Sequence, residues 1–252
     1  MRFKNKVVLI TGAGGKIGTE AARLLAEEGA LLALVDVNLD TIKKVSSELD
    51  IEEDRIIVLK ADVTKESDVK SYVIATIEKF GRIDCFFNTA DIEGKKASLI
   101  DYPVEMFEAV MNVNVKGTFL GLKYVLSEMK KAGKGSIVST ASIESLLGGQ
   151  SMVAYNTSKH AVIGLTKVAA NEAAEFGIRV NALAHGIFST KDSSKESAEP
   201  KKDEEEALVA RVPLGRIAAP DEIVKVALFL LSDEASYVTN SIYTVDGGST
   251  IY

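Results

Sequence analysis

The sequence predicts an α/β fold built on one parallel, doubly wound sheet, and three observations carry that prediction. Short apolar runs alternate with longer amphipathic segments along almost the whole chain. The runs are continuously apolar, which is typical of strands buried on both faces of a parallel sheet. A chain of 252 residues is long enough to bury a sizeable core, and the unbroken alternation predicts a single domain over residues 1–252.

About seven strands are expected from these runs. The first six are short, and the last ends at the turn residues Asp246-Gly247-Gly248. The expected strands are Val7–Ile10, Leu31–Val35, Ile56–Leu59, Ile83–Phe87, Ser136–Ser139, Val180–Leu183 and Ser241–Val245.

Six helices are expected to cover the two faces of the sheet. In the first of them, Leu24, Leu25 and the alanines around them form one apolar stripe. Thr64 is the expected N-cap of the third. The expected helices are Ile17–Glu28, Leu39–Leu49, Asp68–Phe80, Val104–Lys131, Ser151–Phe176 and Asp221–Leu231.

One segment, within residues 189–212, breaks the alternation. Lys191–Glu206 is low in complexity and almost free of apolar side chains. It cannot bury enough surface to offset the entropy of ordering, so we expect a mobile, polar excursion from the domain.

Composition excludes several classes of function. A single Cys and two His are too few for a His/Cys metal site, and one Cys cannot form an internal disulfide. The net charge of −6 argues against a nucleic-acid partner. No apolar stretch reaches the length of a signal peptide or a membrane span. We therefore expect a soluble, cytoplasmic protein with no metal, no nucleic-acid partner and no membrane contact.

A glycine-rich turn, Thr11 to Gly18, follows the first strand and opens the first helix. Glycines let the backbone approach a pyrophosphate, whose charge the helix N-terminus favours. The second strand ends at Asp36, where a carboxylate accepts hydrogen bonds from ribose hydroxyls and repels a 2′-phosphate. The pattern favours NAD over NADP, and the alternative interpretation of Asp36 is a turn residue.

A second candidate site is Tyr155-x-x-x-Lys159 on the fifth expected helix. The i,i+4 spacing places the phenol and the ammonium on one helix face. A nearby cation stabilises phenolate and lowers the pKa of a tyrosine, as a general acid–base for a carbinol–carbonyl interconversion requires.

The motifs together resemble the short-chain dehydrogenase/reductase family over essentially the full length. The glycine turn, Asp36 and Tyr155-x-x-x-Lys159 occur in one order with further family motifs. These are Asp62-Val63, Asn114-Val115-Lys116-Gly117, Ser142, Arg179-Val180-Asn181 and Val245-Asp246-Gly247-Gly248. The family's Asn-Asn-Ala-Gly appears in altered form as Asn88-Thr89-Ala90-Asp91. The resemblance implies a single-domain Rossmann-type fold.

The resemblance also implies roles for the matching residues. Tyr155 would exchange the substrate proton, and Lys159 would lower the pKa of Tyr155 and hold the nicotinamide ribose. Ser142 would hydrogen-bond the substrate oxygen, and Asn114 would help to hold a relay water. Asn114 could instead tie a helix to a neighbouring strand, and Ser142 could merely end a strand. The implied cofactor-binding residues are Gly12, Gly14, Gly15, Lys16, Ile17, Gly18, Asp36, Val37, Asp62, Val63, Asn88, Ala90, Tyr155, Lys159, Gly186 and Thr190.

Four departures from the family pattern bear on function. Lys16 replaces the usual second glycine of the cofactor turn, and Asp91 replaces the glycine of Asn-Asn-Ala-Gly. A buried carboxylate at Asp91 is costly unless it is paired or protonated. His185 stands where relatives have proline, which would add a titratable group near Tyr155. The excursion Lys191–Glu206, in the place of the substrate lid, is highly charged instead of apolar.

The expected function is an NAD-dependent oxidoreductase that interconverts a small secondary alcohol and a ketone. His185, Ile187, Phe188, Ile143 and Glu144 are expected to line the substrate pocket. The alternatives are an NADP-dependent 3-oxoacyl-thioester reductase and a dinucleotide-binding protein with weak or no catalysis. The resemblance also implies a homodimer or homotetramer, with Val162, Ile163, Leu165 and Val168 suited to a core or an interface.

Overall fold

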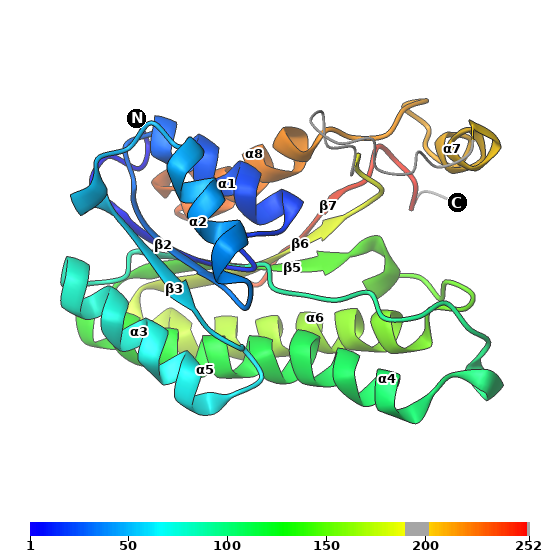
Figure 1. The fold of residues 1–252 in the computed structure, drawn as a ribbon, viewed down its shortest axis with the longest axis horizontal. Coiled ribbons are helices and arrows are strands. Elements are labelled where there is room, and N and C mark those ends of the chain that lie inside the picture. Colours follow the sequence, from blue (N-terminus) through cyan, green and yellow to red (C-terminus); the bar gives the residue numbers. More distant parts are fainter. Residues whose placement is uncertain (190–201, 251–252) are drawn as a thin grey trace.

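One sheet of seven parallel strands carries helices on both faces in the computed structural model, which describes residues 1–189 and 202–250 (Figure 1). The strand order is β3-β2-β1-β4-β5-β6-β7, and every neighbouring pair is parallel. The expected Rossmann-type sheet of seven strands is thus confirmed. The strands are β1 (Val7–Thr11), β2 (Leu31–Asp36), β3 (Ile56–Lys60), β4 (Cys85–Asn88), β5 (Gly135–Ser142), β6 (Ile178–His185) and β7 (Ile242–Val245).

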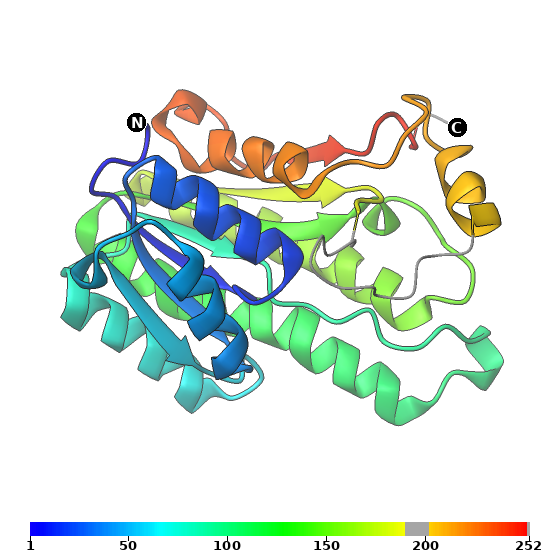
Figure 2. The ribbon, with the colours of Figure 1, turned by 45° about the horizontal axis from the view of Figure 1, so that its top comes forward.

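Two layers of helices cover the sheet. In the views of Figures 1 and 2, α1, α2 and α8 lie on one face, and α3 to α6 lie on the other. The helices are α1 (Lys16–Glu27), α2 (Leu39–Glu48), α3 (Glu66–Phe80), α4 (Val104–Val110), α5 (Gly117–Ala132), α6 (Val153–Ala173), α7 (Lys202–Val209) and α8 (Pro220–Leu231). None of the helices in the described ranges is both long and apolar enough to cross a bilayer.

The continuous apolar runs of the strands follow from burial on both faces. In β1, Val8 and Ile10 pack into the core beneath α1, α2 and α8, whereas Leu9 packs into the core beneath α3, α5 and α6. Successive side chains of a strand point to opposite faces, so a strand between two helical layers needs apolar residues at every position.

The expected helix Val104–Lys131 is interrupted. Between α4 and α5, residues Met111–Lys116 form a π-helical turn, in which Asn114 is buried. Single π-helical turns within α-helices are frequent at functional sites. Apolar periodicity cannot reveal such a turn, because the helical direction continues through it.

One other expectation was wrong. Lys65, and not Thr64, is the N-cap of α3, because the Thr64 hydroxyl donates to Asp62 Oδ1 at 2.7 Å. Within the excursion Lys191–Glu206, α7 begins at Lys202, and the mobility expected for the excursion stays a prediction. The rest of that segment, residues 191–201, lies outside the described residues.

The position of the site follows from the strand order. The chain builds the sheet outward from β1 in one direction and from β4 in the other, so the loops after these two neighbouring strands diverge. At such a switch point a crevice opens beyond the carboxyl ends of the strands. The two strand ends are joined by the Thr11 hydroxyl, which donates to Asn88 Oδ1 at 2.9 Å.

Candidate active site

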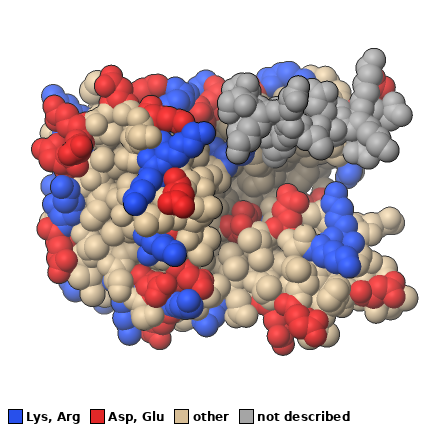
Figure 3. All heavy atoms as spheres, viewed as in Figure 1, with Lys and Arg blue, Asp and Glu red and all other residues tan. Residues whose placement is uncertain are grey.

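Two adjoining cavities lie at the carboxyl edge of the sheet. The larger, of about 480 Å³, lies between the ends of β1, β2 and β3, and the smaller, of about 110 Å³, extends toward α6 and β6. Gly12, Gly15, Thr89 and Asp91 line both of them, so the two cavities form one continuous site. Figure 3 shows a hollow in the molecule at this edge, with acidic side chains around it.

The glycine turn forms a cradle between the cavities. Gly12 has a φ of +66°, and a Cβ there would lie 2.7 Å from the backbone of Ala90. A Cβ on Gly18 would overlap the carbonyl oxygen of Gly12, so α1 can pack this closely only with glycine at that position. Gly15 is the N-cap of α1 and makes no side-chain cap. The N-terminal end of α1 therefore faces the site.

Asp36 closes the far side of this cradle. Its carboxylate accepts from the Gly14 N–H at 3.0 Å and from the Asn38 N–H at 3.0 Å. Asp36 also lines the larger cavity together with the exposed side chain of Val37. The carboxylate is thus held in place at the end of β2, facing the larger cavity.

Asp62 and Val63 line the opposite wall of the larger cavity. The Asp62 carboxylate accepts from both the backbone and the hydroxyl of Thr64, so it also acts as a turn residue before α3. Val63 packs against Gly117, where a Cβ would lie 2.8 Å from Val63 Cγ2. The start of α5 therefore supports this wall.

Tyr155 lines the smaller cavity from α6 and is 5% exposed. Ser142, at the end of β5, lies close enough to the Tyr155 phenol to lower its pKa. Ser142 is the last residue of β5, and its hydroxyl accepts from the Glu144 N–H at 3.2 Å. The predicted pair of hydroxyl groups is thus brought together by two elements that lie next to each other.

Lys159 lies one helical turn after Tyr155 and is almost completely buried. Its ammonium donates to the carbonyl oxygen of Thr140 at 3.0 Å and forms an ion pair with Asp91 at 2.6 Å. The same nitrogen lies 5.3 Å from the centroid of the Tyr155 ring. The carboxylate at position 91 is paired, and its side chain is 30% exposed, so the buried carboxylate considered from the sequence is not what the structure shows.

The pKa of Tyr155 lies well above its ordinary value of 10.0. Burial is the largest cause, the Asp91 carboxylate raises the pKa further, and the Ser142 hydroxyl lowers it. This direction is opposite to the lowering that the sequence predicted. The main physical reason is the burial of the phenol, and the Asp91 carboxylate, which is paired with the cation expected to stabilise phenolate, acts in the same direction.

Asn114 connects three elements behind the site. Its amide accepts from the Ile92 N–H at 2.9 Å and donates to the Ile92 carbonyl at 3.0 Å and to Ser158 Oγ at 2.9 Å. These contacts tie the π-helical turn to the segment after β4 and to α6, which agrees with the structural alternative considered for this residue. Its part in a proton relay stays a prediction.

The other expected site residues divide into two groups. Lys16, Ile17, His185 and Phe188 line the smaller cavity, and Ala90 lines the larger one. The His185 ring meets the Phe188 ring edge-on, with centroids 5.2 Å apart.

The remaining expected residues lie elsewhere. Ile187 lines a separate cavity near Val245, and Gly186 packs against Asp246. Ile143 is buried, while one carboxylate oxygen of Glu144 is buried without a hydrogen-bond partner among the described residues. Asn88 lies beneath the cradle, bonded to Thr11. Thr190 lies outside the described residues.

Two residues of the smaller cavity were missed by the sequence analysis. Thr140 supplies the carbonyl that holds Lys159, and Glu93 lines the cavity wall. Thr140 lies two residues before Ser142 on the same strand, and Glu93 lies two residues after Asp91. The period of two in an extended chain could have placed Thr140 on the face of Ser142.

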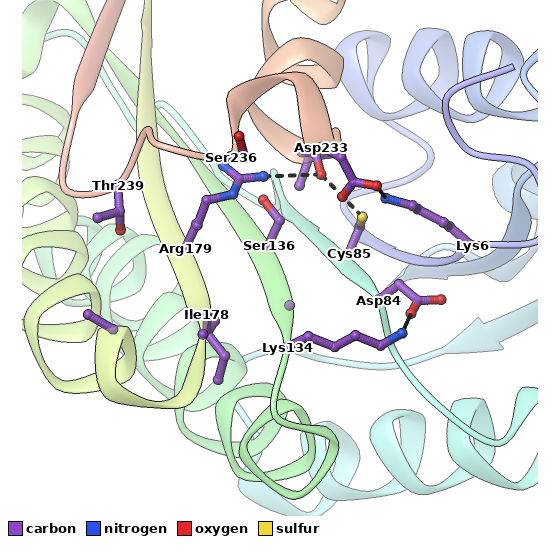
Figure 4. A pocket seen from close by; sticks show the side chains of 14 residues that line it. Lys6, Asp84, Cys85, Lys134, Ser136, Ile178, Arg179, Asp233, Ser236 and Thr239 are labelled. Carbon is purple, nitrogen blue, oxygen red and sulfur yellow. Dashed lines mark hydrogen bonds and ion pairs between the residues drawn. The ribbon is translucent and has the colours of Figure 1, made fainter.

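A further cavity, of about 490 Å³, lies at the opposite edge of the sheet (Figure 4). Lys6 pairs there with Asp233 at 2.6 Å, and Lys134 pairs with Asp84 at 3.9 Å. Arg179 donates to the carbonyls of Leu230 at 2.7 Å and Ser232 at 2.9 Å. Its cations are engaged in tying strands to the end of α8, which indicates a structural role.

Comparison with known proteins agrees with the fold and the site. Residues 12–250 match the family model described as enoyl-(acyl carrier protein) reductase. The chain is 41% identical to levodione reductase of Leifsonia aquatica, over 99% of this chain and 96% of the relative. It is 39% identical to cyclohexanol dehydrogenase of Acinetobacter sp. (strain SE19), over 99% and 96%. It is 40% identical to 3-oxoacyl-(acyl-carrier-protein) reductase of Thermotoga maritima, over 100% of both chains.

Solved structures show the same relationship. The crystal structure of NAD⁺-bound xylitol dehydrogenase matches with a TM-score of 0.92 and 36% identity, over 98% of this chain and 100% of that one. The chain belongs to the short-chain dehydrogenase/reductase family. It is an oxidoreductase of this family, whose relatives act on alcohols and ketones.

Proposed function

We propose that this protein is an NAD(H)-dependent oxidoreductase that interconverts a small secondary alcohol and a ketone. The observation that carries the proposal is that Tyr155 lines a cavity next to the glycine cradle, with the Ser142 hydroxyl beside its phenol and the Lys159 ammonium 5.3 Å from the centroid of its ring. Cyclohexanol dehydrogenase and levodione reductase, similar over nearly the whole chain, support this class of substrate.

The residues present fit a nicotinamide dinucleotide. A Cβ at Gly12 would fill the cradle, and the uncapped start of α1 offers N–H groups to a pyrophosphate. Asp36 supports NAD over NADP, because its fixed carboxylate would repel a 2′-phosphate while it accepts hydrogen bonds from ribose hydroxyls. Asp62 and Val63 would flank the adenine, and Lys159 would hold the nicotinamide ribose.

When bound, the nicotinamide supplies the acceptor or donor of a hydride. Tyr155 gives its hydroxyl proton to the substrate oxygen during ketone reduction and removes it during alcohol oxidation. Ser142 donates a hydrogen bond to the same oxygen and orients it toward the phenol. Tyr155 itself is only 5% exposed, which limits the access of water to this exchange.

Turnover of cyclic and linear secondary alcohols and ketones, measured with both nucleotides, tests the proposal. On any substrate that is turned over, Tyr155→Phe should lower kcat by about 10²–10⁴-fold, because proton transfer is lost. The variant should keep its affinity for NADH, measured by quenching of nucleotide fluorescence. Undiminished turnover by Tyr155→Phe would refute the role of Tyr155.

A second candidate is an NADP-dependent 3-oxoacyl-thioester reductase, favoured by the similarity to the reductase of Thermotoga maritima. Titration with both reduced nucleotides separates the two, because tighter binding of NADPH would contradict the role given to Asp36. Binding of NADH with no turnover of any alcohol, ketone or 3-oxoacyl thioester would instead favour a dinucleotide-binding protein without catalysis.

A further inference from the structure

Asp91 occupies a position that connects the nucleotide cradle with the catalytic group. It comes shortly after the end of β4, and it lines both cavities of the site. Its side chain is 30% exposed, whereas that of Lys159, its partner at 2.6 Å, is 1% exposed. The carboxylate therefore lies between solvent and a buried ammonium.

The ammonium has two contacts that fix its place. The carbonyl of Thr140 holds it from β5, and Asp91 holds it from the segment after β4. With the ring of Tyr155 centred 5.3 Å away, the charge of Lys159 lies close enough to act on the phenol. A carboxylate in direct contact with the ammonium offsets much of the effect of the ammonium on the pKa of the phenol.

We propose that Asp91 is a positioning residue that holds the Lys159 ammonium and offsets its charge beside the Tyr155 phenol. The inference rests on the function proposed above, because it assigns Asp91 a control over the proton that Tyr155 exchanges. The phenol then stays protonated through neutral pH. Ketone reduction, which needs the protonated form, is maintained at neutral and moderately alkaline pH, and alcohol oxidation rises with alkaline pH.

The charged groups around Tyr155 come from every element packed against it. Asp91 and Glu93 face it from the segment after β4, and Glu144 faces it from the turn after β5; all three raise its pKa. Lys159 follows it on α6, and His185 lies at the end of β6. Among these charges Asp91 has the largest effect on the phenol, and it is the carboxylate paired with Lys159.

The same carboxylate affects nucleotide binding. Asp91 lines both cavities together with Gly12 and Gly15, so its negative charge lies near the cradle offered to the pyrophosphate. The Asp91 carboxylate and a bound pyrophosphate would repel each other, because both are negatively charged. A bound ribose would also have to share the Lys159 ammonium with Asp91. Removal of the charge should therefore tighten the binding of NADH.

The test is the pH dependence of Asp91→Asn. Asparagine keeps an oxygen that accepts from Lys159 but removes the charge. The inflection point in the pH profile of kcat/KM should move to lower pH by about one unit or more. The shift should appear in both ketone reduction and alcohol oxidation, because the same phenol exchanges the proton in both directions. NADH affinity should rise several-fold. An inflection unchanged from that of the wild type would overturn the proposal.

Two further variants serve as controls. Glu93→Gln removes a carboxylate that lines the same cavity and faces Tyr155, but that forms no ion pair with Lys159 among the described residues. Its inflection should move much less, and a shift as large as that of Asp91→Asn would show a general effect of charge and contradict the ion-pair role. Asp91→Glu restores a carboxylate and should return the inflection toward that of the wild type.

A substrate-free measurement keeps this inference distinct from the proposed function. The ultraviolet absorbance of tyrosinate is titrated in the wild type and in Asp91→Asn, each with and without Tyr155→Phe, so that the difference isolates Tyr155. The phenol of Asp91→Asn should ionise at lower pH, and equal ionisation would refute the inference even if no substrate is found. If the phenol shifts and no alcohol or ketone reacts, only the proposed function fails.

Discussion

His185 ends β6 at the wall of the smaller cavity, and its protonation state decides whether the site holds a second proton donor. Burial is the largest cause that lowers its pKa below the ordinary value of 6.5, and the Lys159 ammonium acts in the same direction. The ring is therefore neutral at neutral pH. The sequence predicts a titratable group near Tyr155, and in the structure that group is charged only in acid.

This lowered pKa predicts a loss of stability in acid. In the unfolded chain His185 takes up a proton near pH 6.5, whereas the folded chain resists protonation. Stability is thus complete above pH 6.5 and falls as the pH drops from there through the folded pKa. Thermal melting from pH 8 to pH 5 should show a smaller loss of Tm for His185→Gln than for the wild type.

The chain contains its own control for this measurement. His160 is the other histidine, and it is exposed on α6. His160→Gln should keep the wild-type dependence of Tm on pH. If the Tm of His185→Gln depended on pH as the Tm of the wild type does, the burial of His185 would not lower the stability of the folded protein in acid.

At single residues, the sequence predicts best where chemistry is tied to the end of a strand. Asp36, Ser142 and His185 each end a strand, so the apolar run before them sufficed to place them at the carboxyl edge. The pairing of Asp91 with Lys159 joins the segment after β4 to α6 and depends on a tertiary distance. The residue pattern indicates which side chains face the site, but it does not indicate which of these side chains contact each other.

Among the elements, the strands and most helices followed from periodicity, and the exceptions have local causes. The π-helical turn places Asn114 against Ile92 and Ser158, contacts that no helical period contains. At the start of α3, Asp62 takes the Thr64 hydroxyl that was expected to cap the helix. Capping propensity does not show whether a side chain caps the helix or makes a competing hydrogen bond to a neighbouring residue.

The contact between β6 and α8 gives a prediction at the scale of elements. Arg179 lines the cavity at the opposite edge of the sheet (Figure 4) and donates to several carbonyls at and after the end of α8. Arg179→Lys keeps the charge but cannot reproduce this set of bonds. The free energy of unfolding, measured with urea, should fall by about 2 kcal/mol, with NADH affinity unchanged.

Lys134→Gln is the matched change in the same cavity. The Lys134 side chain is 67% exposed and lies 3.9 Å from Asp84, so its loss should alter the free energy of unfolding by less than about 0.5 kcal/mol. A large drop in NADH affinity for Arg179→Lys would contradict a purely structural role and point to a link between the two edges of the sheet.

For the whole molecule, the outer surface of α5 and α6 bears on assembly. Val162 and Ile163, two of the four residues expected to suit a core or an interface, are buried within the chain. Val168 is 57% exposed on α6, and Phe119 on α5 is 47% exposed. The two helices lie side by side on one face of the sheet (Figure 1). We propose that this surface pairs with a second copy of the chain in a homodimer or homotetramer.

Sedimentation of the wild type and of Val168→Glu tests this assembly. The wild type should sediment as a dimer or tetramer at micromolar concentration, because exposed apolar side chains on paired helices favour association. A carboxylate at position 168 should shift the protein toward monomer, since an unpaired charge in an apolar interface is costly. Ser47→Glu, on the exposed side of α2 across the sheet, adds the same charge and should leave the assembly intact. A monomeric wild type, or an oligomer that survives Val168→Glu unchanged, would place the interface elsewhere or exclude it.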